Sequence, residues 1–571
     1  MSAGAAAQAF ARCFVDELAR AGLQHAFVSP GSRSAPLALA LADERQMRVH
    51  VVLDERSAGF AALGAAKAAR RPVAVLCTSG TAAANLHPAV VEAHQSRAPL
   101  LVLTADRPPE LRDTGAPQTI DQTRLFGDAV RWFVDVGVPE PRNDSVAYWR
   151  SVAARACALA SASPPGPVHV NVPLREPLFP AADDVPWLFD LSGRAGGAPW
   201  ASWTQGPRRA SQDDVDGLTA AIERAERGAL VAGACDVEAR PLLELARAAG
   251  WPILAEPTSG LRTGNLAVST YDALLRQEAF ARDHRPDLVV RLGATGISRA
   301  LESWLPPDVP QVSVDRDGKW LDQRRSVRWM IAADPEDLGA RVAARLAPRS
   351  SAWLESWLHH EHVARVAIDE VLDSEPTTSE PRTARDVAAA LPNGSTMVAA
   401  ASMPIRDIDW FMGPRNGLRV LANRGANGID GFVSTASGVA LTQVGGPVVA
   451  VTGDLSLLHD QSGLLLGHDG RLDATFVVIN NGGGGVFSFL PQARLPEHFE
   501  TLFATPQGVD LAALARLHGL SHTPIGTAAE LRPALADALD GRGVHLLEVR
   551  TDRADNVALH EKLWRCVAAA I

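Results

Sequence analysis

The sequence predicts an α/β protein made of three doubly wound domains, each built on a parallel sheet. Short runs rich in valine, isoleucine and leucine recur along the chain and alternate with longer stretches of helical pattern. Most of these apolar runs end in polar residues, as strands do when their carboxyl ends form a binding edge. The chain of 571 residues is also too long for one hydrophobic core, which favours several domains.

The first domain is predicted over residues 1–180. It opens with an amphipathic helix, because Phe10, Phe14 and Leu18 recur at helical spacing. Helices are expected near 57–70 and 82–94, between apolar runs that read as strands. The predicted strands are 25–28, 49–54, 73–79, 99–106 and 167–173.

A linker and two further domains follow. The segment 179–206 is rich in proline, glycine and tryptophan and reads as a linker. A central α/β domain is predicted over 205–350, and it carries no Gly-x-Gly-x-x-Gly fingerprint of a dinucleotide site. A charged helical connector near 350–380 leads to the third domain, 380–571. The predicted strands are 229–234, 251–256, 287–293 and 311–315 in the central domain, and 395–401, 418–425, 447–454, 474–481 and 545–550 in the third.

The composition is ordinary for a globular enzyme, with 47% apolar and 21% charged residues. A formal net charge of −10 and the absence of any lysine- or arginine-rich run argue against a nucleic-acid partner. The five cysteines are scattered without CxxC spacing, which favours reduced thiols over disulfides or a zinc site. No apolar run reaches the length that spans a bilayer, so we expect a cytoplasmic protein without membrane insertion.

Two neighbouring strands of the third domain end in residues that suit a metal ion. Asp454 follows one apolar run and Asn481 the next, and the leucine-rich helix between the runs makes them a parallel βαβ unit. Carboxylate and amide oxygens suit Mg²⁺, which completes its shell with phosphate oxygens and water. The glycines at 482–485 let the backbone approach a diphosphate closely. Each turn taken alone is also explained by ordinary turn chemistry.

Taken together, the two turns resemble the diphosphate–magnesium motif of thiamine-diphosphate-dependent enzymes. The resemblance implies three doubly wound domains, of which the first binds the pyrimidine and the third the diphosphate. It implies Mg²⁺, or Mn²⁺, held by Asp454, Asn481 and the carbonyl of Gly483. Leu455 stands where this family usually has glycine. Leu455, Ser456 and Ser402 are counted among the residues that contact the cofactor.

Glu55 follows the predicted strand 49–54 and opens a helix. By itself it reads as a helix-start acid that interacts favourably with the macrodipole. The resemblance implies instead that Glu55 hydrogen-bonds N1′ of the aminopyrimidine and drives the amino–imino shift by which the cofactor removes its own C2 proton. A carboxyl group in an apolar pocket has a raised pKa and shares a proton near neutrality. Glu55 is the predicted catalytic residue.

Ile429 lies in the glycine-rich segment 424–431, between a strand and a helix of small residues. The segment alone reads as a strand-to-helix turn. The resemblance implies that Ile429 wedges between the two rings of the cofactor and enforces its bent conformation. In the same family the glutamate domain of one subunit faces the diphosphate domain of another, which implies a homodimer or homotetramer with active sites between subunits.

Arginines stand at the carboxyl ends of strands in both outer domains. Arg33 lies in SPGSRS, Arg107 in TADRP with Gln118 in the next loop, and Arg406 and Arg424 follow strands of the third domain. One such arginine is usually part of a weak surface salt bridge. Several of them predict a substrate with more than one carboxylate, because guanidinium groups bind carboxylates in bidentate fashion.

Seven segments in order resemble one subfamily, the synthases of menaquinone biosynthesis that make 2-succinyl-5-enolpyruvyl-6-hydroxy-3-cyclohexene-1-carboxylate. They are SPGSRS, DER, TSGTA, ADRP, NRGANGIDG, GDLS and NNGGGGVFSFLP. The resemblance implies decarboxylation of 2-oxoglutarate on the cofactor and 1,4-addition of the resulting carbanion to isochorismate. It implies that the substrates are held by Ser32, Arg33, Arg107, Gln118, Arg299, Arg406 and Arg424, with Val486 and Phe487 as an apolar wall. Arg299 stands where some members have a Lys-Arg pair, with Ala300 in the second place.

Two other interpretations remain. Another thiamine-diphosphate enzyme, such as an acetolactate synthase or a 2-oxoacid decarboxylase, acts on smaller keto acids and does not need this set of arginines. A non-catalytic metabolite-binding protein on the same scaffold does not need Glu55. The joint presence of Glu55, Asp454 and Asn481 favours an enzyme.

Overall fold

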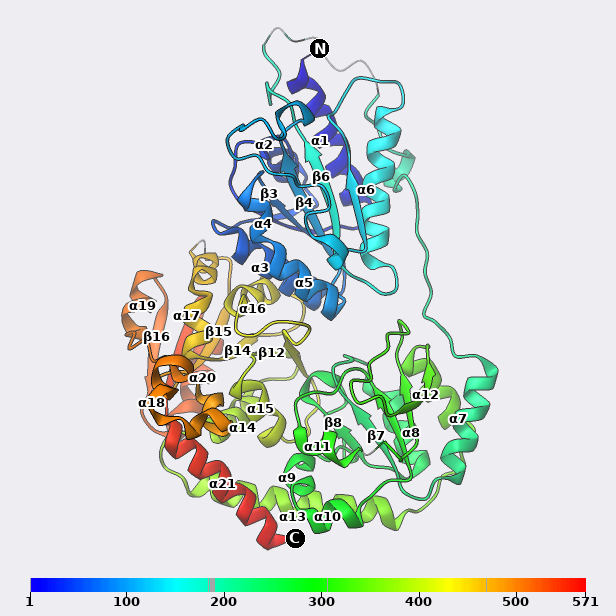
Figure 1. Cartoon of the computed structure of the whole chain (residues 1–571), viewed down its shortest axis with the longest axis vertical. Coiled ribbons are helices and arrows are strands. Elements are labelled where there is room, and N and C mark those ends of the chain that lie inside the picture. Colours follow the sequence, from blue (N-terminus) through cyan, green and yellow to red (C-terminus); the bar gives the residue numbers. More distant parts are fainter. Residues whose placement is uncertain (1, 183, 185–189, 306, 469) are drawn as a thin grey trace. The chain divides into compact units, whose positions relative to one another are not determined.

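The computed structural model describes residues 2–182, 184, 190–305, 307–468 and 470–571 (Figure 1). The described chain contains three sheets whose paired strands are all parallel, with helices packed beside them, as the sequence predicts. The strands of each sheet lie within one of the predicted ranges 1–180, 205–350 and 380–571. The chain forms two compact units: unit 1 is residues 1–205, 423–444 and 456–473, and unit 2 is 206–422, 445–455 and 474–571.

The sheet of unit 1 has the strand order β2-β1-β3-β4-β6-β5. Every residue of β1, β3, β4 and β6 is buried, which explains their near-continuous apolar sequences. The strand β2 ends three residues earlier than predicted, and β5 was not predicted. The bounds are β1 (His25–Val28), β2 (Arg48–Val51), β3 (Val73–Cys77), β4 (Leu100–Asp106), β5 (Trp132–Asp135) and β6 (Val168–Pro173).

The helices of unit 1 cover this sheet. Phe10 and Phe14 of α1 are fully buried, as their helical spacing predicts. The single helix predicted near 82–94 is two helices, because Pro88 has no N–H for a continuous helix and instead stands in the first turn of α5. The bounds are α1 (Ala3–Arg20), α2 (Ala35–Asp43), α3 (Glu55–Ala69), α4 (Thr81–Asn85), α5 (His87–Ser96), α6 (Ser145–Ser161) and α16 (Phe432–Leu441).

Two helices of unit 1, α3 and α16, pack with their backbones in close approach. A Cβ atom added at Gly64 would lie 2.0 Å from the carbonyl oxygen of Thr435, and one added at Gly438 would lie 1.9 Å from that of Ala61. Only glycine permits such an approach. The contact fixes the start of α3, where Glu55 lies, relative to the chain that enters α16.

The central sheet of unit 2 has the order β11-β10-β9-β7-β8. The predicted linker 179–206 has only a short 3₁₀ turn at Ala195–Gly197 in its described part. The predicted connector is one long helix, α13 (Ala352–Ser374). The other bounds are β7 (Gly228–Ala232), β8 (Ile253–Ala255), β9 (Leu288–Leu292), β10 (Gln311–Val314), β11 (Val327–Ile331), α7 (Gln212–Arg224), α8 (Ala239–Ala249), α9 (Tyr271–Leu275), α10 (Glu278–Asp283), α11 (Arg299–Trp304) and α12 (Pro335–Ala343).

The second sheet of unit 2 has the order β13-β12-β14-β15-β17-β16, and its two middle strands, β14 and β15, are adjacent. The strands β14, β15 and β17 carry the buried apolar runs predicted for them. The bounds are β12 (Ser395–Ala399), β13 (Leu418–Ala422), β14 (Val448–Gly453), β15 (Ala474–Asn480), β16 (Ser521–Ile525), β17 (Val544–Arg550), α14 (Glu380–Ala390), α15 (Met403–Phe411), α18 (Pro496–Phe499), α19 (Leu511–Leu517), α20 (Leu531–Asp540) and α21 (Arg553–Ala570). The helix α17 (Asp454–His459) begins in unit 2, and its residues from Ser456 onward belong to unit 1.

The three strands that the sequence analysis missed share one property. β5, β11 and β16 each lie at an edge of their sheet. Their residues are mostly half-buried or exposed, so they lack the continuous apolar run of an inner strand. β16 also contains Pro524, which inner strands do not tolerate.

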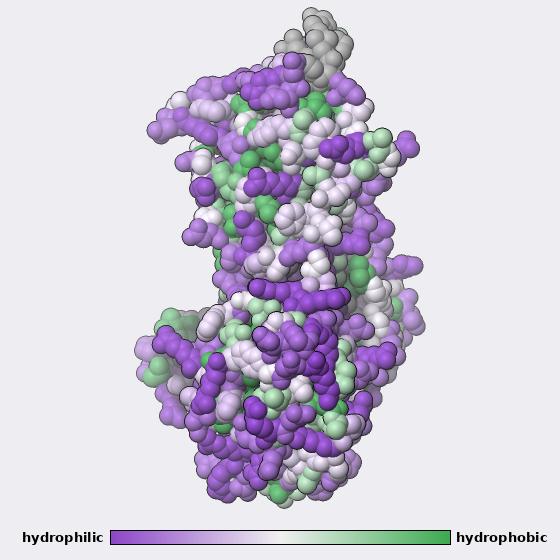
Figure 2. Space-filling view, turned by 90° about the vertical axis from the view of Figure 1, so that its right-hand side faces the viewer, coloured by the Kyte–Doolittle hydropathy of each residue, from purple (hydrophilic) through white to green (hydrophobic). Residues whose placement is uncertain are grey.

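The surface is mainly polar on the face shown in Figure 2, with small apolar areas scattered among hydrophilic residues. Within the described parts of the chain, every helix is too short or too polar to cross a membrane.

Replacing Gly438 with alanine is expected to lower the free energy of unfolding by about 1–3 kcal/mol, because the new Cβ would overlap the backbone of α3. This cost exceeds the roughly 1 kcal/mol by which alanine is preferred over glycine in a helix. Chemical denaturation measures the change. Gly339→Ala in α12 is the matched control, because its Cβ would meet the end of the flexible Leu242 side chain. Equal stability of Gly438→Ala and the wild type would contradict the close-packing account.

Candidate active site

The ends of β14 and β15 bring the predicted metal-binding residues to one edge of the sheet. In the parallel register Gly453 lies opposite Ile479. Asp454 directly follows Gly453 and begins α17, while Asn481 comes two residues after Ile479. The strand-end prediction therefore holds for their placement, because both residues follow adjacent strands at the same carboxyl edge.

The carboxylate of Asp454 is buried and held by backbone groups. It accepts a hydrogen bond from the N–H of Leu455 at 2.8 Å, and the backbone of Gly483 lies near enough to lower its pKa. Burial raises the pKa of Asp454, and these backbone groups act in the opposite direction. Asp454 and Gly483, two of the three predicted metal-binding residues, thus lie close together.

Asn481 has one satisfied and one unsatisfied amide atom. Its Nδ2 donates to Oε1 of Glu380 at 2.8 Å. Its Oδ1 is buried and has no hydrogen-bond partner among the described residues. A buried carbonyl oxygen without a hydrogen bond lowers the stability of the fold by about 1–3 kcal/mol. The arrangement therefore fits a ligand that binds Oδ1.

Gly483 shows why the run of glycines is needed. Its φ of +136° is a conformation that side chains rarely adopt, and an added Cβ would lie 2.2 Å from the carbonyl oxygen of Ala504. The next residue, Gly484, donates its N–H to the same oxygen at 2.7 Å. A side chain at 483 would therefore displace the backbone that lies against Asp454.

A divalent ion fits this donor set. No group of three or more histidine, cysteine, aspartate or glutamate side chains is placed to hold a metal ion in the described parts of the chain. An ion here would depend on one carboxylate together with amide and backbone carbonyl oxygens. Mg²⁺ accepts such a set, because it binds few protein groups and retains water and phosphate oxygens.

Buried acidic residues lie behind Asn481. Glu380 is fully buried, and its Oε1 also accepts from the hydroxyl of Thr551 at 3.3 Å. Burial raises the pKa of Glu380 to about 7, and the neighbouring carboxylate of Asp407 adds to the shift. Asp407 is itself paired with Nε2 of His560 at 2.9 Å. Glu380 could not be recognised from the sequence, because an acid at the start of a helix is common.

Glu55 is the first residue of α3, immediately after the capping residue Asp54. It is half-buried, and its Oε2 accepts from Nδ2 of Asn85 at 3.4 Å. The Cys77 thiol at the end of β3 has a raised pKa, chiefly through burial and additionally through the charge of Glu55. Glu55 therefore lies near the carboxyl edge of the unit 1 sheet, as predicted.

The loop that precedes α16 is bound to a buried acid of α5. Glu92 is fully buried and accepts from the backbone N–H groups of Gly425, Ala426 and Asn427 at 2.6–3.1 Å. Lys67 of α3 adds an ion pair with Glu92 at 3.0 Å. Burial alone would raise the pKa of Glu92, but Lys67 and the loop N–H groups hold it below its usual value. Neither Glu92 nor Lys67 could be recognised from the sequence, because both read as helix-interior positions.

This anchored loop carries two predicted site residues, Arg424 and Ile429. Arg424 is exposed and immediately precedes the N–H groups that Glu92 binds. Ile429 is half-buried, and its carbonyl oxygen accepts from the hydroxyl of Ser456 at 3.3 Å. Lys67 also donates to Oδ1 of Asn423 at 2.7 Å, at the start of the loop. Both predicted residues therefore lie on backbone that Glu92 and Lys67 hold.

Two predicted substrate residues of unit 1 meet at Ser79, which follows β3. Arg107 donates to the hydroxyl of Ser79. Gln118, in the left-handed region with φ of +54°, donates its side-chain amide to the carbonyl oxygen of Ser79 at 3.1 Å. Burial lowers the pKa of Arg107, and the positive charge of Arg33 adds to this. The guanidinium groups of Arg33 and Arg107 are therefore close enough to interact.

Arg33 is buried and already has partners. It donates to the carbonyl oxygen of Leu174 at 2.9 Å and to Oε1 of Glu176 at 2.6 Å. The Glu176 side chain is 70% exposed, so this pair lies at the surface end of the guanidinium. Ser32 is exposed, and its carbonyl oxygen accepts from the N–H of Ala35 where α2 begins.

The remaining predicted residues lie on several elements of unit 2. Ser402 precedes α15 with φ of +73°, a strained conformation for a residue other than glycine, and Arg406 donates to its carbonyl oxygen. Val486 and Phe487 are half-buried in a 3₁₀ turn, where the Phe487 ring lies 5.7 Å from that of Phe503. Arg299 stands elsewhere, as the exposed first residue of α11 beside the central sheet.

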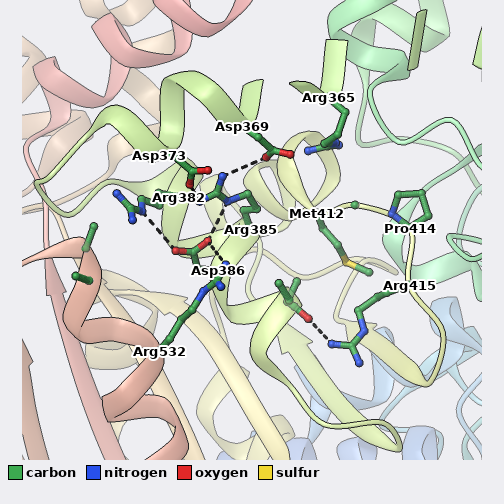
Figure 3. Close-up of a pocket in the computed structure, with 15 residues that line it drawn as sticks. Arg365, Asp369, Asp373, Arg382, Arg385, Asp386, Met412, Pro414, Arg415 and Arg532 are labelled. Atoms are coloured by element: carbon green, nitrogen blue, oxygen red, sulfur yellow. Dashed lines mark hydrogen bonds and ion pairs between the residues drawn. The ribbon is translucent and has the colours of Figure 1, made fainter. Parts of the chain in front are cut away.

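A separate cavity of about 520 Å³ in unit 2 is rich in arginine but contains none of the predicted site residues (Figure 3). Its guanidinium groups are used within the fold. Arg365 donates to the carbonyl oxygen of Phe411 at the end of α15, and Arg415 to that of Ala388 in the last turn of α14. Such contacts stabilise helix C-termini. Arg385 is paired with Asp369, Asp373 and Asp386.

Three family models match the chain in the order of its sheets. They describe the N-terminal TPP-binding domain of thiamine pyrophosphate enzymes, over residues 8–125, the middle domain of thiamine pyrophosphate, over 198–398, and the C-terminal TPP-binding domain, over 410–549. Together they cover Glu55 in the first model and Asp454 and Asn481 in the third.

Curated relatives match nearly the whole chain, and those named here are all called 2-succinyl-5-enolpyruvyl-6-hydroxy-3-cyclohexene-1-carboxylate synthase. The protein of Thermobifida fusca is 49% identical over 99% of both chains. That of Geobacillus kaustophilus is 45% identical over 98% of both chains. That of Chloroflexus aurantiacus is 45% identical over 97% of this chain and 95% of its own.

Replacing Glu92 with glutamine is expected to destabilise the protein by about 3 kcal/mol, because Lys67 would keep its charge in a buried position without a counter-charge. The midpoint of denaturant unfolding measures the loss. The double variant Glu92→Gln, Lys67→Met removes both charges and is expected to recover part of the stability. A double variant that is as unstable as the sum of the two single variants would show that the pair is not coupled.

Proposed function

Because the chain belongs to the thiamine pyrophosphate enzymes and, within them, to the 2-succinyl-5-enolpyruvyl-6-hydroxy-3-cyclohexene-1-carboxylate synthases, we propose that it decarboxylates 2-oxoglutarate and adds the resulting carbanion to isochorismate. Thiamine pyrophosphate and thiamine diphosphate are two names for the same cofactor. The observation that carries the proposal at the site is the buried, unpartnered Oδ1 of Asn481, at the same edge of the sheet as the carboxylate of Asp454. This is the donor set that a metal-bound diphosphate needs.

Family membership also decides between the interpretations that the sequence left open. The synthase is favoured over an acetolactate synthase or 2-oxoacid decarboxylase, because the relatives of matching length carry the synthase name. It is favoured over a non-catalytic metabolite-binding protein for the same reason. The protein is a thiamine-diphosphate-dependent enzyme of menaquinone biosynthesis.

In the proposed site Asp454, Asn481 through Oδ1 and the carbonyl of Gly483 hold Mg²⁺, with Mn²⁺ as a substitute. The fit rests on the unpartnered Oδ1 and on the close backbone at Gly483. Leu455, Ser456 and Ser402 contact the cofactor from the ends of β14 and β12. Thiamine diphosphate supplies the electron sink for decarboxylation.

Glu55 is proposed to exchange a proton with N1′ of the aminopyrimidine. Its half-buried carboxyl at the start of α3 is supported on one side by Asn85. Ile429 is proposed to press on the cofactor and keep its rings bent, and Glu92 supports this role by fixing the preceding backbone. Within unit 1, α3, which begins with Glu55, packs closely on α16, which follows the loop that carries Ile429.

The substrates are proposed to be held by guanidinium and amide groups. Arg33, Arg107 and Gln118 form a positive cluster at the edge of the unit 1 sheet, which suits the carboxylates of 2-oxoglutarate and isochorismate. The cluster fits a dicarboxylate better than a small neutral group. Ser32, Arg299, Arg406 and Arg424 are proposed as further substrate contacts, and Val486 and Phe487 as an apolar wall.

A homodimer or homotetramer with active sites between subunits is proposed on the family pattern. It is supported by two exposed apolar residues just before Glu55, Val51 at 64% and Leu53 at 71% exposure, on the edge strand β2 and the turn after it. Exposed apolar side chains next to a catalytic residue suit a surface that a partner covers. The negative net charge supports small-molecule substrates over nucleic acid, and the free cysteines support a cytoplasmic enzyme.

The function is tested by incubating the purified enzyme with 2-oxoglutarate, thiamine diphosphate and Mg²⁺, with and without isochorismate, and identifying the products by mass. We expect loss of CO₂ that depends on isochorismate and a succinyl adduct of the ring. Consumption of pyruvate with intact 2-oxoglutarate would leave the cofactor assignment in place but contradict the substrate assignment.

Glu55→Gln is expected to lower kcat by about 10²–10⁴-fold while thiamine diphosphate binds with little change, because only the proton exchange at N1′ is lost. Cofactor affinity is measured by fluorescence titration and turnover by product formation. Asp54→Asn is the matched control at the same helix start, because asparagine caps a helix as well as aspartate. Unimpaired turnover of Glu55→Gln would refute the assigned role.

A further inference from the structure

Asn480 ends β15 and Asn481 follows it, and each donates its side-chain amide to a buried glutamate. Nδ2 of Asn480 lies 2.8 Å from Oε1 of Glu548, and Nδ2 of Asn481 lies 2.8 Å from Oε1 of Glu380. The two glutamates are 1% and 0% exposed. Of the two asparagines, only Asn481 has a buried Oδ1 without a hydrogen-bond partner among the described residues. Only the Asn481 pair therefore leaves an amide oxygen that can bind a ligand.

Glu380 is held in place by three elements. It is the first residue of α14, where the helix dipole favours a negative charge. Its Oε1 accepts from Asn481, after β15, and from the hydroxyl of Thr551, after β17. These two strands are adjacent and parallel, and the N–H of Thr551 donates to the carbonyl oxygen of Asn480 at 3.1 Å. The acceptor that faces Asn481 is therefore fixed by the sheet itself.

An acceptor at this position determines which way the Asn481 amide points. The oxygen and the nitrogen of an amide occupy nearly the same space, so packing alone does not distinguish the two orientations. Oε1 of Glu380 accepts from Thr551 as well as from Asn481, and it remains an acceptor when a proton is on Oε2, so Nδ2 faces Glu380 and Oδ1 faces away. The reverse orientation would place the N–H groups where the metal ion is proposed to bind, and these cannot ligate it.

We propose that Glu380 is a positioning residue that directs Oδ1 of Asn481 toward the divalent ion. The proposal rests on the proposed function, in which Asn481 is a ligand of Mg²⁺. Outer groups of this kind typically change metal affinity by about 10–100-fold when they are removed. Glu380 itself touches neither the cofactor nor the substrates in this account.

The test is the affinity of the full-length enzyme for Mn²⁺ in the presence of thiamine diphosphate, measured by electron paramagnetic resonance of the free ion. Glu380→Met removes the acceptor and is expected to raise the Kd for Mn²⁺ by about 10-fold or more. Glu380→Gln keeps an oxygen that can accept from Nδ2 and is expected to raise the Kd by less than about 3-fold. An unchanged Kd in Glu380→Met overturns the proposal.

Glu548→Met is the matched control, because it removes the acceptor from the neighbouring asparagine, which is not a proposed ligand. Its Kd for Mn²⁺ is expected to stay within about 2-fold of the wild-type value. An equal loss of affinity in Glu548→Met and Glu380→Met would show a general effect of a lost buried acid and would also overturn the proposal.

In the Asn481→Asp variant, removal of Glu380 is expected to change the Kd for Mn²⁺ in the opposite direction. In Asn481→Asp the ligand is a carboxylate that needs no orientation, and Glu380 now repels it. Adding Glu380→Met, or Glu380→Gln if the former does not fold, is expected to lower the Kd for Mn²⁺ relative to Asn481→Asp alone. A merely structural role of Glu380 predicts loss of affinity in both backgrounds, so a loss here contradicts the positioning role.

The proposed function fails in a distinguishable way. If Asn481→Ala binds Mn²⁺ with thiamine diphosphate as tightly as the wild type does, Asn481 is not a ligand, and both the metal site and the role of Glu380 are wrong. If Asn481→Ala loses the ion while Glu380→Met retains it, the metal site stands and only the positioning role is overturned.

Discussion

The parallel register of β14 and β15 is the constraint on which the site depends. It places Gly453 opposite Ile479, so that Asp454 and Asn481 leave the sheet at one edge. Parallel strands gather their carboxyl ends in this way whatever follows them in sequence, which lets residues far apart in the chain form one donor set. Gly483, after Asn481, then approaches the backbone of Ala504 closely, because it has no side chain to prevent it.

The buried carboxylates Glu92 and Glu380 each hold a polar group of the predicted site in place through hydrogen bonds. Glu92 holds three N–H groups of the loop that carries Ile429, and Lys67 neutralises it. Glu380 holds the amide of Asn481. Buried ion pairs add little net stability compared with apolar packing, but they leave few alternative arrangements for the groups they bind. The same logic accounts for the arginines of the cavity in Figure 3, which bind helix ends and carboxylates.

Much of the fold could be predicted from the sequence, because inner parallel strands are buried on both faces and read as apolar runs. The edge strands β5, β11 and β16 were missed, since half-exposed strands lose that signal. The positions of Asp454, Asn481 and Glu55 near the ends of strands could be predicted, because these polar residues directly follow apolar runs in the sequence. Glu380 and Glu92 could not, because their partners lie 101 and more than 300 residues away in sequence.

The most direct measurement is a crystal structure of the enzyme with thiamine diphosphate and Mn²⁺, in which anomalous scattering locates the ion. We expect one Mn²⁺ at the ends of β14 and β15, bound by Asp454, by Oδ1 of Asn481 and by the carbonyl of Gly483, with Nδ2 of Asn481 still donating to Glu380. An ion bound elsewhere, or an Asn481 side chain that does not contact it, would contradict the account.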